Sequence, residues 1–181
     1  MARLITIGGA PATGKSTLAR FLEKETGIKR ISMDDLKETF FDLGGCRDRE
    51  WSKEIGALAW PTFQGLINMH VGRGDNVIAE ATFLWPDDHL WIQELSDRNS
   101  ADLIQFWMSA NPMVARERFV HRANTERHPG HCDALEHVME EFDERFFNKS
   151  FIPMPISGKT KIVDTTNFDD VDHDEILRFI S

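Results

Sequence analysis

Cysteine is scarce in this chain of 181 residues, which contains two, Cys46 and Cys132. They lie far apart, so they form neither a disulfide framework nor a CxxC metal or redox motif, and a reducing compartment is favoured. Long apolar runs are also absent. No stretch approaches the roughly 18 residues of a membrane span, and the apolar residues at 4–7 are too few for a signal peptide. We expect a cytoplasmic protein without a membrane partner.

Basic residues are outnumbered, because 21 Lys and Arg stand against 30 Asp and Glu, for a formal net charge of -9. Nucleic-acid backbones and anionic membranes reward a basic surface, so broad binding to either is disfavoured. Six of the acidic residues lie at 164–175, where there is no Lys or Arg, so a locally basic site elsewhere is allowed. The composition is that of a folded chain, and we expect one domain over residues 1–181.

Short apolar runs alternate with longer stretches of helical periodicity, which is the pattern of β-α units on a mostly parallel sheet. The runs predict five strands, at residues 4–7, 28–31, 76–79, 103–108 and 161–163. Helices are expected between them and at the end of the chain. Pro61 should kink or divide the long helix that carries Ile55 and Ile67.

The strongest motif is GAPATGKS at 9–16, a full match to the P-loop pattern GxxxxGK[ST] between a predicted strand and a predicted helix. Its glycines let backbone N–H groups point at phosphate oxygens, and the helix N-terminus adds partial positive charge. We expect ATP, with GTP as the alternative, and Mg²⁺ on the Ser16 hydroxyl. The predicted nucleotide-binding residues are Gly9, Ala10, Pro11, Ala12, Thr13, Gly14, Lys15, Ser16 and Thr17. The fold class is therefore α/β, a P-loop NTPase three-layer α/β/α sandwich around a mostly parallel five-stranded sheet.

Asp34 follows the second predicted strand at the start of a helix, near the sheet edge where the P-loop also opens. There it would accept the proton of an acceptor hydroxyl as the γ-phosphate transfers, with Lys15 on the outer phosphates. The alternative is plain stabilisation of the helix dipole, typical of an acidic first turn. Asp35 is the better candidate for a purely structural role, as the capping partner of Ser32.

Together, LITIGGAPATGKSTLARFL and ISMDDLKET resemble the small P-loop kinases that phosphorylate hydroxyl groups. These are the kinase domain of phage-type polynucleotide 5′-kinase, chloramphenicol phosphotransferase and the zeta-toxin-like sugar-nucleotide kinases. In this family an acidic residue after the second strand acts as the base, which matches Asp34. The segment NPMVARERFVHR resembles the start of the family's helical lid, which implies a lid at about residues 115–137. The resemblance is absent from residues 42–75, and we expect that stretch to shape the acceptor pocket.

The resemblance implies further roles. Arg122 would stabilise charge on the transferring phosphoryl group, and Arg118 would cover the adenine or contact phosphate. Both lie on one helical face, so a solvated basic stripe is the alternative. Glu80 stands where an Asp is usual; it would contact Mg²⁺ through water or touch the acceptor, or be a buried strand-end carboxylate. Asn167, after the last strand, is a candidate contact to the base.

The lid loop ANTERHPGHCD contains Arg127, His128 and His131. Arg127 would swing toward the site on closure. The histidine spacing matches no standard zinc pattern, so we expect a polar lid surface, with acceptor recognition as its functional alternative. Arg116 lies off the arginine face and is expected to be solvated.

The leading hypothesis is an ATP- and Mg²⁺-dependent phosphotransferase that moves the γ-phosphate to a hydroxyl of an unidentified small-molecule acceptor. A polynucleotide or nucleoside 5′-hydroxyl kinase is the first alternative, although the acidic charge speaks against a polynucleotide. The second is a nucleotide-hydrolysing regulatory switch without an acceptor. For that alternative, Glu80 is the sole candidate for the carboxylate that ends a Walker-B strand.

Overall fold

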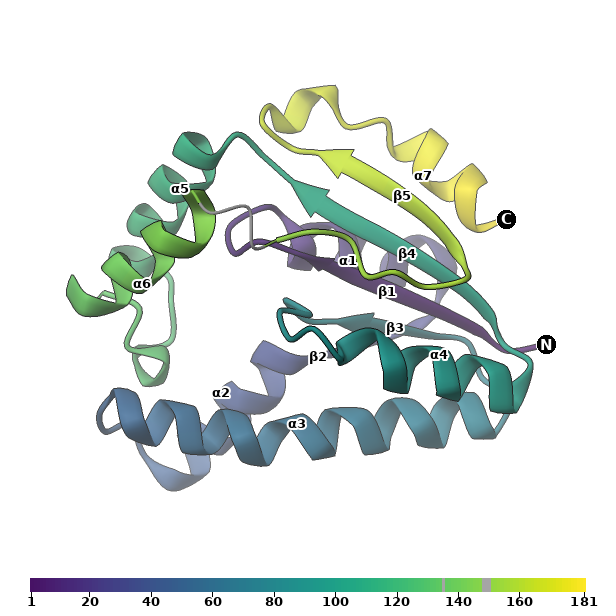
Figure 1. The fold of residues 1–181 in the computed structure, drawn as a ribbon, viewed down its shortest axis with the longest axis horizontal. Coiled ribbons are helices and arrows are strands. Elements are labelled where there is room, and N and C mark those ends of the chain that lie inside the picture. The colour runs from purple at the N-terminus through teal and green to yellow at the C-terminus, as the bar shows by residue number, and fades with distance from the viewer. Residues whose placement is uncertain (135, 148–150) are drawn as a thin grey trace.

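The sheet is the centre of the molecule in this computed structural model, which describes residues 1–134, 136–147 and 151–181. Its strands are all parallel, in the order β2-β3-β1-β4-β5 (Figure 1). Their bounds are β1 Arg3–Gly9, β2 Lys29–Ser32, β3 Val77–Glu80, β4 Asp102–Ser109 and β5 Lys159–Asp164. The five predicted strands are thus confirmed with small shifts at their ends, and the sheet is wholly rather than mostly parallel.

Helices cover both faces of the sheet, which confirms the three-layer α/β/α sandwich (Figure 1). Helices α3 and α4 pack on one face, and α1 and α7 pack on the other. The described helices are α1 Lys15–Thr26, α2 Met33–Gly44, α3 Arg49–Gly72, α4 Asp88–Asn99, α5 Pro112–Thr125, α6 Glu136–Phe147 and α7 His173–Ile180, with short 3-10 helices η1 Pro129–His131 and η2 Phe168–Asp170. None of the helices in the described part of the chain is long and apolar enough to cross a bilayer.

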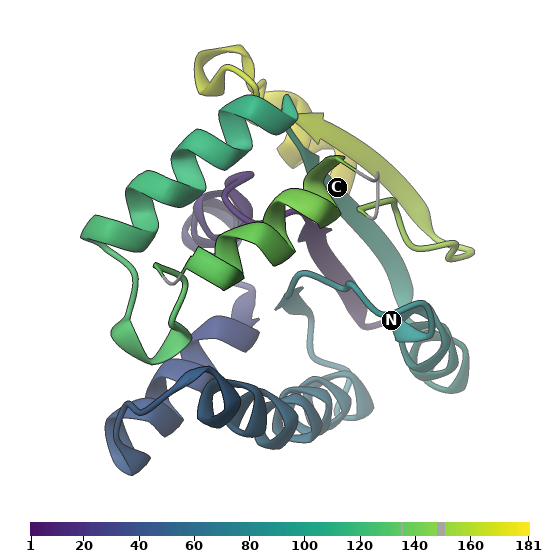
Figure 2. The same ribbon diagram turned by 60° about the vertical axis from the view of Figure 1, so that its left-hand side comes forward.

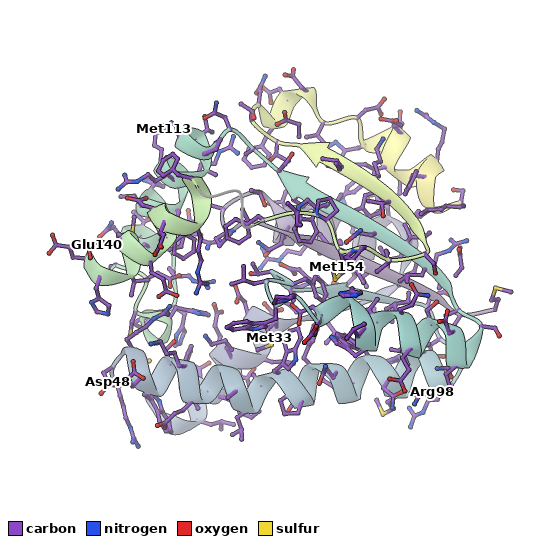
Figure 3. The ribbon with its side chains drawn as sticks, in the orientation of Figure 1. Met33, Asp48, Arg98, Met113, Glu140 and Met154 are labelled. Carbon is purple, nitrogen blue, oxygen red and sulfur yellow. The ribbon has the colours of Figure 1, made fainter. Side chains whose placement is uncertain are left out.

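Alternation along the central strands divides the core into two layers. On β1, Leu4 faces α3 and α4, whereas Ile5 and Ile7 face α1 and α7. On β4, Trp107 faces α3 and α4 and Phe106 faces α1 and α7, because successive side chains of a strand point to opposite faces. Burying each such side chain contributes about 1.5–3 kcal/mol, so both layers stabilise the sheet. Figure 3 shows Met154, a member of the first layer, near the middle of the molecule.

Helix α3 is not divided at Pro61, contrary to one of the two expected outcomes. It runs for 24 residues, and the Thr62 hydroxyl donates to the Leu58 carbonyl at 3.2 Å beside the proline. A proline inside a helix costs about 3 kcal/mol. The face that contains Ala59, Phe63 and other fully buried residues packs on the sheet and offsets that cost.

The sheet order brings three strand ends together. Strand β3 lies between β1 and β2, and Glu80 at its end is level with Ile7 on one neighbour and Ser32 on the other. The loop after β1 and the start of α2 therefore flank Glu80 at the carboxyl edge of the sheet. Helices α5 and α6 lie beyond this edge (Figures 1 and 2), where the rings of Phe119 and Phe142 stack with centroids 3.8 Å apart.

Candidate active site

The loop between β1 and α1 has the geometry of a phosphate cradle. Gly14 adopts a left-handed conformation at the start of α1, with φ of 83°, and Ala12 also has a positive φ of 58°. The Thr13 hydroxyl donates to the Ala10 carbonyl at 2.6 Å, which closes the turn from behind. The exposed amino end of α1 then has backbone N–H groups and partial positive charge available to an anion.

Lys15 lies over this loop. Its ammonium donates to the carbonyls of Gly9 at 3.1 Å and Ala10 at 2.8 Å. Burial lowers the pKa of Lys15 to about 8, although Asp34 and Glu80 act in the opposite direction. The ammonium therefore loses its proton closer to neutral pH than an ordinary lysine does.

We expect nucleotide affinity to fall above about pH 8, by up to tenfold per pH unit, because neutral Lys15 no longer attracts phosphate. The phosphates raise the pKa of Lys15 in the complex, so binding in that range should take up a proton. Calorimetry in two buffers of different ionisation enthalpy measures both effects. In Lys15→Arg the guanidinium stays charged, and the pH dependence should flatten. Equal wild-type affinity at about pH 7 and pH 9.5 would contradict the expectation.

The P-loop opens into a cleft of about 560 Å³. Six of the predicted nucleotide-binding residues line it, namely Pro11, Ala12, Gly14, Lys15, Ser16 and Thr17. Gly9, Ala10 and Thr13 shape the loop from behind. Asp34, Glu80 and Arg122 line the same cleft, so the structure brings the predicted catalytic and metal residues together.

Glu80 joins the P-loop to the second strand. Its carboxylate accepts from the Ser16 hydroxyl on one side and from Arg30 Nη1 at 2.7 Å on the other. The Glu80 side chain is 4% exposed and that of Arg30 is 11% exposed. A hydroxyl and a carboxylate at a P-loop are the hard oxygen donors that Mg²⁺ prefers, so this pair fits the metal that the fold implies.

Glu80→Ala should lower the free energy of unfolding by about 1–3 kcal/mol, because it leaves the Arg30 guanidinium without its buried carboxylate. Arg30 keeps its contact with Asp35, which limits the loss. Urea unfolding measures the difference. Asp102→Ala is the matched control, since its pair with Arg3 is about one third exposed and should cost less than about 1 kcal/mol. Equal losses in the two variants would show that the Glu80 pair adds nothing through burial.

Asp34 lies at the first turn of α2 and forms an ion pair across the cleft. Arg127, from the segment after α5, donates to its Oδ2 at 2.8 Å and to Asp133 at 2.8 Å. Burial alone would raise the pKa of Asp34, but Arg127, His131 and Lys15 outweigh it and hold the pKa well below its usual range. Among the described residues none donates to Asp34 Oδ1, which leaves that oxygen for another donor. The expected inward position of Arg127 is thus already present.

The loop that contains His128 and His131 was expected to form a polar lid surface, but it packs inward against α2. His131 is 2% exposed, and its two ring nitrogens contact Glu38 at 3.0 Å and Arg127 at 3.0 Å. Burial lowers the pKa of His131, against the opposing effect of Glu38. His128 contacts Asp42 at 3.3 Å and stacks on Phe41. The loop is held inward because three carboxylates of α2 attract it, an attraction that loop composition does not reveal.

The lid arginines differ in their contacts. Arg122 points into the cleft, and its buried Nε has no partner among the described residues. Arg118 instead stacks on Phe168 at 4.0 Å and donates to the Thr165 carbonyl at 2.7 Å. Arg116 keeps 37% of its side chain exposed, in line with its expected solvated position, and pairs there with Asp143.

Phe168 packs on the P-loop, 2.7 Å from where a Cβ of Gly14 would stand. Asn167 caps η2 through Asp169 and lines a separate hollow of about 380 Å³ along β5 and α7. The contacts of Arg118 and Asn167 with a nucleotide stay predictions.

The AAA domain family model AAA_33 matches residues 4–148. The chain belongs to this AAA domain family. A crystal structure of a "putative kinase" from Chloroflexus aurantiacus shares 32% identity with a TM-score of 0.87, over 99% of this chain and 96% of that chain. With these matches, the P-loop kinase-like family expected from the sequence is confirmed.

More distant proteins agree with the fold. Kti12 from Chaetomium thermophilum, solved with ADP-AlF3, has a TM-score of 0.65 at 18% identity, and the match covers 98% of this chain and 99% of that chain. A gluconokinase from Sinorhizobium meliloti has a TM-score of 0.55 at 15% identity, covering 98% and 87%. The protein Rv2004c of Mycobacterium tuberculosis is 29% identical over 145 residues, which is 75% of this chain but 28% of that relative. The chain thus spans less than one third of that relative's length.

Several residues of the cleft or its support were not predicted from the sequence, among them Lys37, Glu38, Arg30 and Asp133. Lys37 and Glu38 follow Asp34 by three and four positions on α2, and helical spacing would have placed both beside it. No local sequence pattern would have placed Arg30 or Asp133 at the cleft. Arg30 reaches Glu80 because β2 pairs with β3, and Asp133 reaches Arg127 through the fold of the loop.

Proposed function

We propose that this P-loop kinase-like protein is an ATP- and Mg²⁺-dependent phosphotransferase for a hydroxyl of a small-molecule acceptor. The observation that carries the proposal is the convergence of the P-loop and Asp34 on one cleft. A hydrolase needs a group that orients water, whereas an acid-base side chain beside the phosphate cradle suits an acceptor hydroxyl. The similarity to kinases supports the same class.

Different residues of the cleft would bind the phosphates, bind Mg²⁺ and accept the proton. The P-loop N–H groups and Lys15 hold the phosphates, and Arg122 neutralises charge on the transferring group. Ser16 and Glu80 would hold Mg²⁺, which when bound supplies further neutralisation of the phosphates. Asp34 Oδ1 accepts the hydrogen of the acceptor hydroxyl. As the acceptor oxygen bonds to the γ-phosphorus, the bond from phosphorus to the β–γ bridging oxygen breaks, and the proton passes to Asp34.

Arg127 sets the strength of this base. Its ion pair keeps Asp34 ionised but makes it a weak proton acceptor. Phosphate oxygens compete for Arg127, and their arrival would free Asp34 for the hydroxyl. In this proposal the lid at about residues 115–137 comprises most of α5, η1 and the start of α6; Leu135 lies outside the described residues.

An acceptor screen tests the proposal. The protein, ATP and Mg²⁺ are incubated with phenicols, aminoglycosides, sugars, nucleosides and a short oligonucleotide, and phosphorylated product is detected by mass. One class of small molecule should gain a phosphate, and Lys15→Met should abolish the product. ATP hydrolysis at a rate indifferent to every acceptor would instead favour a regulatory hydrolase. Product from the oligonucleotide, with binding that weakens steeply as salt rises, would favour the polynucleotide kinase.

A further inference from the structure

Lys37 is a cation of the cleft that the proposed transfer does not use. It follows Asp34 by three positions on α2, so both side chains lie on one helical face, and both line the cleft. The side chain is partly buried against α3, with Nζ 3.7 Å from where a Cβ of Gly56 would stand. Its ammonium also lies 5.5 Å from the centre of the Phe41 ring.

The neighbouring carboxylates are already engaged. Arg127 binds both Asp34 and Asp133, and His131 binds Glu38. Within the described residues Lys37 has neither an ion pair nor a hydrogen bond to a carboxylate, in contrast to Arg127. The nearby carboxylates are thus paired with Arg127 and His131, and the positive charge of Lys37 is not neutralised by any described carboxylate.

A partly buried ammonium without a carboxylate partner is costly. Burial lowers the pKa of Lys37, against the opposing effect of Asp34. Such a charge is commonly compensated by an anion, and where the protein supplies none a ligand can do so. Arg49 lines the same cleft; its guanidinium pairs with Glu141 at 3.4 Å and donates to the His131 carbonyl at 3.2 Å, and its buried Nε has no partner among the described residues.

Lys37 lies beside α3 in the cleft, whereas Lys15 donates to carbonyls of the P-loop. The charges that act most on Lys37 are those of Asp34, Arg127, Arg49 and Asp133. Those that act most on Lys15 are Asp34, Glu80, Arg122 and Arg127. Asp34 and Arg127 are thus charged neighbours of both lysines, whereas Glu80 acts on Lys15 and Arg49 acts on Lys37.

We propose that the acceptor carries an anionic group, a carboxylate or a phosphate, that binds Lys37 while its hydroxyl contacts Asp34. This inference rests on the proposed phosphotransferase function and narrows its substrate class. Trp60 and Phe83 line the same cleft and offer an apolar wall to the body of the acceptor. The acceptor is then a small hydroxy acid or a phosphorylated alcohol or sugar.

Matched compounds test the inference. Glycerol, glycerate and glycerol 3-phosphate form one set, and glucose, gluconate and glucose 6-phosphate form a second. For the set that is phosphorylated, kcat/KM for an anionic member should exceed that of the neutral member at least about tenfold, the scale of a charge-assisted hydrogen bond. The carboxylate and phosphate members distinguish the two kinds of anion.

Variants of Lys37 test whether this residue causes the preference for anionic acceptors. Lys37→Gln should raise KM for the preferred anion about 10- to 100-fold while KM for ATP changes less than about threefold. Lys37→Arg should retain most of the preference, because the charge remains. Lys53→Gln is the matched control, an exposed lysine of α3 that pairs with Glu50 outside the cleft, and it should behave as wild type. Thermal melting confirms that each variant folds.

The two proposals fail in different ways. Preference for the neutral members, or an equal rise in KM for ATP and acceptor in Lys37→Gln, would overturn the anionic acceptor while the kinase stands. ATP hydrolysis that is indifferent to both sets and to the whole acceptor screen would overturn the kinase, and the inference with it.

Discussion

Asp34→Asn should lower turnover about 100-fold or more while the affinity for ATP changes little, the usual scale for loss of a general base. The amide keeps the shape of the carboxylate but cannot take up the acceptor proton. Asp34 lines the cleft beyond the phosphate cradle, and its Oδ1 accepts from none of the described residues, whereas Lys15 bonds directly to the loop. Loss should therefore appear in kcat and not in nucleotide binding.

Three measurements support that experiment. Acceptor-dependent product formation gives kcat, calorimetry gives the affinity for ATP, and thermal melting shows whether the fold survives loss of the pair with Arg127. Arg127 retains Asp133, so the variant should fold. Asp42→Asn on the same helix is the matched control, because Asp42 is exposed and contacts only His128 among the described residues. Turnover near the wild-type rate in Asp34→Asn would remove this residue from the base role.

Gly9→Ala should lower the free energy of unfolding by at least about 3 kcal/mol, the sum of backbone strain and overpacking. Gly9 ends β1 with φ of 123°, a conformation that side chains rarely adopt. A Cβ there would lie 2.1 Å from the Met108 carbonyl oxygen, an atom of the backbone of β4. That backbone is held in the sheet and cannot move aside without disturbing the strand pairing.

Gly74→Ala separates the two causes. Gly74 also has a positive φ, of 85°, but a Cβ there would meet no atom within 4 Å. It should lose only the conformational part, about 1 kcal/mol. Urea unfolding measures the free energy of unfolding of both variants, and the m-value should equal that of the wild type. Equal losses of unfolding free energy in the two variants would show that the close contact of Gly9 with β4 does not contribute to the cost of Gly9→Ala.

The fold was predicted well because its signals are local. The short, mainly apolar stretches at 4–7 and 76–79 predict buried strands, and GxxxxGK[ST] predicts a strand, a turn and a helix in that order. The sequence predicted that Pro61 would kink or divide the long helix, and division was wrong, because packing of a whole helical face outweighs the cost of one proline.

The site was predicted in part for the same reason. Lys15, Ser16 and Asp34 belong to segments whose local structure determines where they lie, and the sheet brings them to one cleft. Arg30, His131 and Asp133 acquire their roles from partners that are distant in the sequence. Residues 42–75, outside the family resemblance, contribute Arg49 and Trp60 to the cleft; their role with an acceptor stays a prediction.

The α/β class and the phosphate cradle follow from the sequence alone, because strand alternation and P-loop turn chemistry depend on residues that are neighbours along the chain. The tertiary structure alone decided which charges are paired. It placed Arg127 on Asp34 and Arg30 on Glu80, and it left Lys37 and Arg122 without a carboxylate among the described residues. Coulomb interactions act through space, so the balance of charge at a cleft depends on distances that only the folded chain sets.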